Sequence, residues 1–314
     1  MRVIIAGSGL LGASVMEPLL ESGHEVVGLI QNGRATPPAK RRSARLRALF
    51  APPSISTPGL ALRHGVPVLW LDAMNETELN PLRALDPDLI IACGFGIIFN
   101  KTLLDLPHIG CINVHSSLLP EHRGPSPFAH VILANRTASG VTFHVMDEDI
   151  DTGDILHQVT FPLTSMDTGL TVYHKASSAA GDHILEVVDD IEINALRGTP
   201  QDSSRATYDP RMTDDAAMID WREPAEDIER LVRAAVAYYP AWFTHRRRLI
   251  RVTRATFDPR PVDGPAGRVL ETSPYPVVAT GQGRLIVHAA HITAPIPWSW
   301  PAPWSRLKAA DLLY

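Results

Sequence analysis

The chain has only two cysteines among its 314 residues, Cys93 and Cys111, and neither stands in a Cys-x-x-Cys or Cys/His spacing. Such a pair provides neither a disulfide framework nor the ligand set of a structural metal. No apolar run approaches the roughly 20 residues that a membrane span requires, and Met1 is followed directly by a strand pattern instead of a secretory leader. We therefore expect a cytoplasmic protein without a metal and without a membrane partner.

An excess of positive charge is also lacking, since 29 basic residues face 34 acidic ones and the formal net charge is −5. The whole chain is therefore not a nucleic-acid binder by electrostatics. The balance is uneven, however, because residues 1–209 carry a net charge of −8 and residues 210–314 a net charge of +3. The hydrophobic content of 45% predicts a globular protein with a real core, and the length allows one large domain or two ordinary ones.

The first thirty residues have the pattern of a strand, a glycine-rich turn, a helix and a second strand. The turn is Gly7-Ser-Gly-Leu-Leu-Gly12, which matches the dinucleotide fingerprint. That fingerprint also requires a carboxylate at the end of the second strand, where this chain has Gln31 and Asn32. We interpret the glycines as a tight strand-to-helix turn of a doubly wound fold and expect no NAD to bind, with a dinucleotide site as the alternative.

The remaining patterns predict a two-domain α/β protein. Apolar periodicity predicts strands at residues 66–69, 89–93, 112–115 and 140–146 and helices at residues 76–85, 128–135 and 168–191. Residues 198–212 are polar and form a linker, and a helix at residues 224–236 is followed by four short β-like runs between residues 249 and 289. We predict a doubly wound, mostly parallel sheet in residues 1–205 and a small β-barrel in residues 206–314.

Two polar side chains on the strand at residues 112–115 are candidates for catalysis. Asn113 and His115 are two residues apart, so they point to the same face of the strand. Together they form a two-donor site that holds a developing oxyanion if the imidazole is charged. A later strand runs into the acidic turn 147–151, and a carboxylate that returns beside His115, such as Asp151, orients the ring and favours its protonated form. The alternatives are a hydrogen-bonded polar pair at a strand end and a solvated acidic loop.

These residues belong to a longer pattern, namely Asn113-x-His115, Ser117-Leu-Leu-Pro120 and Asp151-Thr-Gly-Asp-Ile155. The pattern resembles the folate-dependent formyltransferases, which include methionyl-tRNA formyltransferase, sugar-amine N-formyltransferases, glycinamide ribonucleotide formyltransferase and 10-formyltetrahydrofolate hydrolases. The resemblance to the methionyl-tRNA branch extends over nearly the whole chain, including Ile219-Asp-Trp221, and it implies a Rossmann-like first domain followed by an OB-like barrel.

The resemblance implies that a formyl group moves from 10-formyltetrahydrofolate to an amine, with neither NAD nor a metal. Asn113 and protonated His115 then hold the formyl oxygen, and Asp151 keeps His115 charged. The residues implied for the folate are Gly94, Phe95, Gly96, Ile97, Ile98, Leu118, Asp147 and Asp149. The residues implied for the acceptor are Ser117, Arg123, Gly124, Pro125, Arg41 and Arg42.

The acceptor is predicted from the places where the chain departs from the tRNA enzymes. Residues 40–47 are rich in arginine but lack the motif of those enzymes, residues 125–130 differ beside the acceptor pocket, and a Trp/Pro-rich segment at 296–304 replaces their basic tail. We therefore predict a primary amine on a small or carrier-linked molecule. Methionyl-tRNA is the alternative, hydrolysis of the formyl donor is a second one, and a non-catalytic folate- or nucleic-acid-binding module is a third.

Overall fold

The computed structural model describes residues 1–41, 43, 48, 52, 56–292, 300, 301, 308 and 311–313. The chain forms two compact units. The first unit is made of Met1–Pro127, Ala138–Pro162 and Tyr173–Asp209, and the second unit is made of Phe128–Thr137, Leu163–Val172 and Pro210–Tyr314. The predicted domain boundary between residues 205 and 206 stays a prediction.

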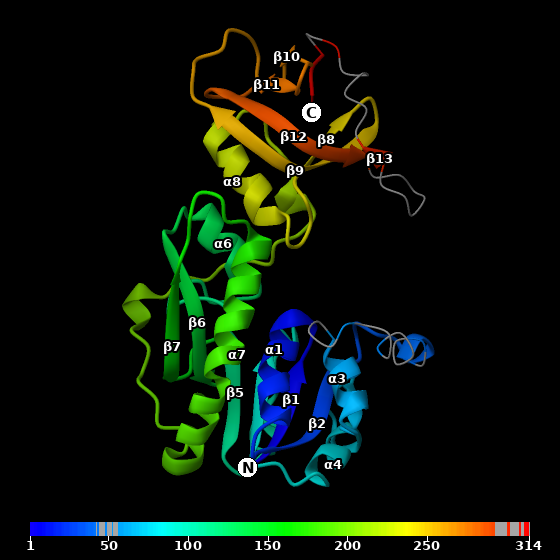
Figure 1. Cartoon of the computed structure of the whole chain (residues 1–314), viewed down its shortest axis with the longest axis vertical. Helices are drawn as coiled ribbons and strands as arrows, with labels where there is room; N and C mark the ends of the chain where they lie inside the picture. Colours follow the sequence, from blue (N-terminus) through cyan, green and yellow to red (C-terminus); the bar gives the residue numbers. More distant parts are fainter. Residues whose placement is uncertain are drawn as a thin grey trace. The chain divides into compact units, whose positions relative to one another are not determined.

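The first unit is built on a seven-stranded sheet with the order β3-β2-β1-β4-β5-β6-β7 (Figure 1). Neighbouring strands from β3 to β5 are parallel, whereas β6 and β7 run antiparallel. The strands are β1 (Arg2–Gly7), β2 (Glu25–Asn32), β3 (Val68–Leu71), β4 (Leu89–Cys93), β5 (Gly110–His115), β6 (Ala138–Val145) and β7 (Ile155–Pro162). The strand order reverses between β1 and β4, and ligands of open α/β sheets bind at the carboxyl ends of strands beside such a reversal.

Helices cover both faces of this sheet. They are α1 (Gly9–Leu20), α3 (Thr57–Arg63), α4 (Glu76–Arg83), α5 (Lys101–Leu104) and α7 (Gly169–Asn194), of which α7 begins in the second unit. Adjacent residues of β1 show the two-sided burial, since Ile5 packs in the cluster that includes Ala180 of α7 and Ile4 packs in the cluster that includes Leu79 of α4. Burial on both faces explains why the parallel strands are nearly continuous apolar runs.

The glycine turn between β1 and α1 is required by close packing. A Cβ added at Gly7 would lie 2.5 Å from the Sγ atom of Cys93 and 2.9 Å from its carbonyl oxygen. A Cβ at Gly12 would lie 3.1 Å from the carbonyl carbon of Gly7. This contact supports the interpretation of the motif as a tight strand-to-helix turn, and the absence of NAD binding stays a prediction.

The second unit contains an antiparallel sheet with the order β10-β11-β12-β9-β8, and β13 pairs with β12. Its strands are β8 (Trp242–His245), β9 (Arg248–Asp258), β10 (Val269–Glu271), β11 (Val277–Ala279), β12 (Arg284–Ile292) and β13 (Trp300–Pro301). The helix α8 (Ala225–Ala235) buries Ile228 and Val232 in a core with Val252 of β9 and Leu285 of β12. Irregular register between β9 and β12 bends the long strands. The predicted fold class is confirmed.

Two further helical elements and one absence complete the fold. The helix α6 (Pro127–Leu133) begins at the first boundary between the units, and short 3-10 turns lie at Ser203–Arg205 and Asp215–Ala217. Among the described residues, no helix combines the length and apolarity needed to cross a membrane. The strands β7 and β8 were not predicted from the sequence, because their apolar residues are few and interrupted by polar ones.

Candidate active site

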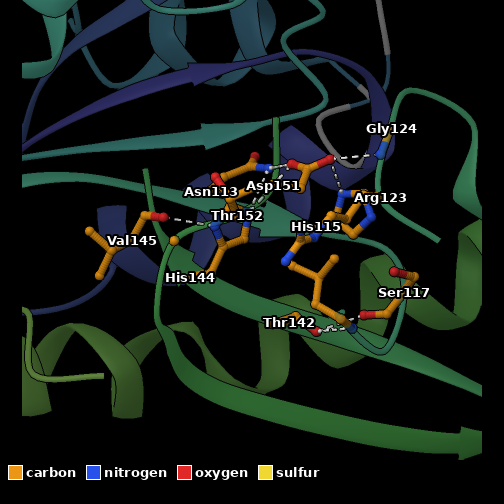
Figure 2. Close-up of polar contacts among 12 residues, drawn as sticks. Asn113, His115, Ser117, Arg123, Gly124, Thr142, His144, Val145, Asp151 and Thr152 are labelled. Carbon is orange, nitrogen blue, oxygen red and sulfur yellow. Dashed lines mark hydrogen bonds and ion pairs between the residues drawn. The ribbon is translucent and has the colours of Figure 1, made fainter. Parts of the chain in front are cut away.

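The structure brings Asn113, His115 and Asp151 together at the end of β5 (Figure 2). Asn113 and His115 leave the same face of β5, and the loop after β6 returns Asp151 between them. The amide nitrogen of Asn113 donates to Oδ1 of Asp151 at 3.1 Å. Nδ1 of His115 lies 3.5 Å from Oδ2 of the same carboxylate. The strand spacing alone could not establish this return of Asp151, which needs the whole β6 hairpin.

A backbone amide and a side-chain amide hold Asp151 in place. The amide of Gly124 donates to Oδ2 of Asp151 at 2.8 Å, and Nε2 of Gln201 donates to the Asp151 carbonyl at 2.9 Å. Asp151 has φ 54°, a left-handed conformation that aspartate tolerates better than most residues. Gly124 has φ 111°, and a Cβ added there would lie 2.4 Å from the carbonyl oxygen of Asp209. Only glycine therefore fits where this amide meets the carboxylate.

His115 is fixed from its other side by a second histidine. Its Nε2 donates to the carbonyl oxygen of His122 at 2.9 Å. The His122 ring is buried, its Nδ1 lies 2.6 Å from Oδ2 of Asp209, and its backbone amide donates to Oγ1 of Thr207 at 2.8 Å. Residues 198–212, which were predicted to form a linker, therefore position the loop that holds His115. Sequence reasoning missed His122 and Asp209, because no local spacing connects residues 87 positions apart.

A third histidine, His144 on β6, completes the cluster. It pairs directly with Asn113 of β5. Its Nδ1 lies 2.8 Å from the carbonyl oxygen of Val145 and donates to it, so in the neutral ring Nε2 is an acceptor. That Nε2 lies 3.2 Å from the amide nitrogen of Asn113 and 3.5 Å from Oδ1 of Asp151. His144 thus orients the Asn113 amide. The sequence analysis overlooked it, although the alternation of β6 was a usable signal.

Burial and charge pull the pKa values of this cluster in opposite directions. Burial lowers the pKa of His115 below its ordinary value, while Asp151 and the carbonyl of His122 oppose that shift. Burial by itself raises the pKa of Asp151, but His115, His144 and the Gly124 amide outweigh it and hold that pKa well below its usual range. The carboxylate is therefore ionised, and burial shifts the His115 ring toward its neutral form. The role of Asp151 in keeping His115 protonated stays a prediction, because the carboxylate raises the pKa of this ring while burial lowers it.

These shifts predict that acid destabilises the protein through this cluster. A lowered pKa in the folded state means that the unfolded chain binds more protons, so the free energy of unfolding falls as the pH drops below about 6.5, the unperturbed histidine value. Asp151 adds to the loss at lower pH. Urea unfolding from about pH 7 to about pH 5 should show a smaller loss in His115→Asn than in the wild type. Equal pH slopes in both proteins would contradict the lowered pKa.

The loop predicted to hold the folate follows β4 at the strand-order reversal. Gly94 and Gly96 have φ 62° and 74°, and Oγ of Ser8 donates to the Gly94 carbonyl at 2.9 Å. Phe95 is buried, whereas the side chain of Ile98 is 62% exposed. A cavity of about 610 Å³ lies on one side of this loop. It is lined by Gly96, Ile97 and Ile98 with Asn32, Arg34, Ala35, Ala73, Met74 and Asn100, and by none of the three catalytic candidates.

The other predicted folate contacts lie apart from that cavity lining. Leu118 is half-buried and packs on Gly140 of β6. Asp147 and Asp149 are exposed, and Asp147 accepts hydrogen bonds from the hydroxyl of Thr152 and the amide of Asp149. Both acidic residues thus help to shape the turn that delivers Asp151. Their contact with a folate stays a prediction.

Two of the predicted acceptor contacts are buried inside the protein. The Ser117 hydroxyl is fully buried and donates to the carbonyl of Glu121 at 2.8 Å. The Arg123 guanidinium is buried and donates to Oε1 of Gln201 and to the hydroxyl of Tyr208 at 2.7 Å each. These hydrogen bonds hold the loop around Gly124, which is also a predicted contact of the acceptor.

The remaining predicted acceptor contacts are Pro125 and two arginines of the basic segment. Pro125 is exposed. The Arg41 guanidinium donates to both carboxylate oxygens of Asp72, at 2.7 and 2.6 Å, and lies over the ring of Trp70. Its charge is therefore already balanced within the first unit. Arg42 lies outside the described residues.

Comparison with known proteins identifies the family. Residues 1–188 match the family "Formyl transferase" and residues 211–299 match "Formyl transferase, C-terminal domain". The methionyl-tRNA formyltransferase of Pseudomonas fluorescens (strain SBW25) is 36% identical over 235 residues, which are 74% of this chain and 71% of that protein. The chain belongs to the formyl transferase family and is an enzyme of this transferase class.

Two further relatives extend the similarity over both units. The methionyl-tRNA formyltransferase of Bacillus velezensis (strain DSM 23117 / BGSC 10A6 / LMG 26770 / FZB42) is 31% identical over 314 residues, covering 99% of this chain and 94% of that protein. The N-formyltransferase of Helicobacter canadensis, solved with folinic acid and dTDP-3-aminofucose, has a TM-score of 0.67 at 19% identity, over 91% of this chain and 98% of that one. At that identity the structural likeness shows the fold alone.

Proposed function

We propose that this enzyme transfers the formyl group of 10-formyltetrahydrofolate to the amino group of methionyl-tRNA. The observation that carries the proposal is the similarity to methionyl-tRNA formyltransferases over nearly the full length of both proteins. That similarity includes the second unit.

This proposal reverses the preference drawn from the sequence, which placed a small or carrier-linked amine first and methionyl-tRNA second. The departures at residues 40–47 and 125–130 remain, but they are local, whereas the relatives match along the chain. An amino-sugar or amino-acid acceptor stays the second candidate. It is favoured by the Arg41–Asp72 ion pair, which neutralises one arginine expected to meet phosphates.

In the proposed reaction the acceptor amine attacks the formyl carbon, and negative charge develops on the formyl oxygen. Asn113 is the proposed donor to that oxygen, because its side chain is only half-buried whereas that of His115 is buried. Its two amide hydrogens face Asp151 and His144, so one of these two hydrogen bonds is exchanged for the bond to the formyl oxygen. A positioned donor of this kind contributes about 3 kcal/mol to stabilising the transition state. The new carbon–nitrogen bond forms as the bond from the formyl carbon to the folate nitrogen breaks.

The His115–Asp151 pair handles the proton that the amine loses. A neutral His115 whose Nε2 donates to His122 has a free electron pair on Nδ1, which faces the ionised carboxylate. A proton taken up between Nδ1 and Oδ2 converts the ring to an imidazolium with an acceptor at each nitrogen. The same proton can then pass to the departing folate nitrogen, so the pair acts first as a base and then as an acid.

The second unit supplies cationic groups for a polyanionic acceptor. Arg247 lies in the turn between β8 and β9, and Arg248 is the first residue of β9. Both are exposed, and Arg254 is exposed further along β9. Within the part of the chain that the structure describes, none of these three arginines forms an ion pair. They are therefore available to RNA phosphates, which dominate the affinity of proteins for nucleic acids.

Replacing two of these arginines should weaken methionyl-tRNA formylation and make it less sensitive to salt. Each phosphate contact that Arg247→Ala/Arg248→Ala removes should reduce the salt slope of binding by about one unit. The measurement is kcat/KM for methionyl initiator tRNA over a range of salt concentrations, with 10-formyltetrahydrofolate as donor. Amino-sugar nucleotides and free amino acids are assayed in parallel.

The matched control is Arg222→Ala/Arg260→Ala, which removes the same charge from the same unit. Both of these arginines are exposed and already paired, with Asp220 and Asp258. The control should formylate tRNA almost as the wild type does. A wild-type enzyme that prefers an amino-sugar nucleotide or an amino acid to methionyl-tRNA would overturn the proposal, and formate release without any amine would indicate a hydrolase.

A further inference from the structure

A group of metal-ligating side chains lies in the first unit and takes no part in the site described above. It consists of His157 on β7 and His183 and Glu186 on α7, and the candidate ligand atoms of all three lie within 4.8 Å of one another. The two imidazole rings are 5.2 Å apart between centroids and tilted by 31°. Nδ1 of His183 lies 3.3 Å from Oε2 of Glu186.

The fold explains why these side chains meet. His157 pairs directly with Phe143 of β6, so both rings leave the same face of the sheet. Phe143 is buried in the core that contains Ile184 of α7, which places α7 over this face. His157 lies on β7, the edge strand, and His183 and Glu186 occupy one side of α7 at an i, i+3 spacing.

The half-buried His157 has no hydrogen-bond partner that explains its position. Within the described residues, neither of its ring nitrogens makes a hydrogen bond, and its recorded neighbours are the rings of Phe143 and His183. Two imidazoles side by side with a carboxylate beyond them can together ligate one cation. This is the donor set that binds zinc in many proteins.

We propose that His157, His183 and Glu186 bind a divalent transition-metal ion of the zinc class. Zn²⁺ bonds of roughly 2.0–2.2 Å place tetrahedral ligand atoms about 3.4 Å apart. The present spacing closes by rotation of the side chains, of which His183 is 35% and Glu186 66% exposed. Water takes the fourth position. The ion links the edge strand β7 to α7 and stabilises the β6–β7 hairpin, whose turn carries Asp151.

A neighbouring cluster on the same helix provides the contrast. His24, Asp189 and Glu192 also lie within ligand distance of one another. There the charges are already compensated, because Nε2 of His24 lies 3.0 Å from Asp189 and the Met1 amine lies 3.3 Å from Glu192. The amine also contacts Nδ1 of His24 at 3.2 Å. A positive group therefore occupies the place that an ion needs.

The test is a calorimetric titration of the full, untagged chain with ZnCl₂. We expect one saturable site and a higher melting temperature with zinc, since binding to the folded state alone stabilises it. His157→Ala, His183→Ala and Glu186→Gln should each weaken zinc binding at least about tenfold, the effect expected from losing even an outer-shell partner. His24→Ala is the matched control and should bind as the wild type does. Cobalt should give the visible spectrum of a tetrahedral site, which His183→Ala loses.

Three outcomes would overturn the site. The first is a wild type without saturable zinc binding. The second is zinc binding by His157→Ala and His183→Ala as tight as that of the wild type. The third is a loss of zinc binding in His24→Ala. Glu186→Gln keeps the assay informative if a histidine variant folds poorly, because Glu186 is exposed and its replacement has the same size. Circular dichroism melts confirm that each variant is folded before its affinity is compared.

Discussion

Asn113→Ala, His115→Ala and Asp151→Asn are each expected to lower kcat for formyl transfer by at least about a hundredfold. In the proposed mechanism, Asn113 provides the donor for the formyl oxygen and the other two residues handle the proton. Because the three side chains share one network, the losses should not add in a double variant of His115 and Asp151. Single-turnover kinetics with saturating donor separates this loss of chemistry from weaker binding.

A second histidine–aspartate pair gives the matched control for this experiment. Nε2 of His108 lies 2.8 Å from Oδ1 of Asp86, as an exposed pair on the same unit. His108→Ala and Asp86→Asn change the same residue types at the surface and should retain the wild-type kcat. Near-normal turnover in a folded variant of Asn113, His115 or Asp151 would remove that residue from the mechanism.

Gly124→Ala is expected to damage both the stability and the activity of the protein. A side chain at φ 111° is strained whatever the space, and its Cβ would lie 2.4 Å from the Asp209 carbonyl oxygen. Backbone strain and overpacking each cost about 1–3 kcal/mol, so we expect the free energy of unfolding to fall by about 2–4 kcal/mol. The Gly124 amide also donates to Asp151, so kcat should fall at least about tenfold.

Urea unfolding and steady-state kinetics on the same preparation check both effects. Gly23→Ala is the matched control, because an added Cβ there meets no atom within 4 Å and the backbone needs no positive φ. It should leave both quantities within experimental error. A Gly124→Ala protein with wild-type stability would contradict the prediction. It would mean that residues 122–124 can move away from residues 207–209 without any loss in the free energy of unfolding.

Local patterns predicted much of the first unit. The apolar runs predicted β1, β2, β4 and β5 within two residues at each end, because strands buried on both faces are continuous apolar runs in the sequence. The helical periodicity predicted α7. The pair Asn113 and His115 was assigned to one face from its spacing alone. The strand β7 was missed, because one side of an edge strand faces solvent and its sequence alternates too weakly.

The sequence by itself determined the fold class, the family and the three catalytic candidates, since those depend on periodicity and on an ordered motif. Tertiary structure decided how the candidates are arranged. It returned Asp151 to His115, placed His144 beside Asn113, and brought His122 against Asp209, contacts between residues that are 31 to 87 positions apart in the chain. It also lowered the pKa of His115, because burial is a property of the folded protein that no short stretch of sequence records.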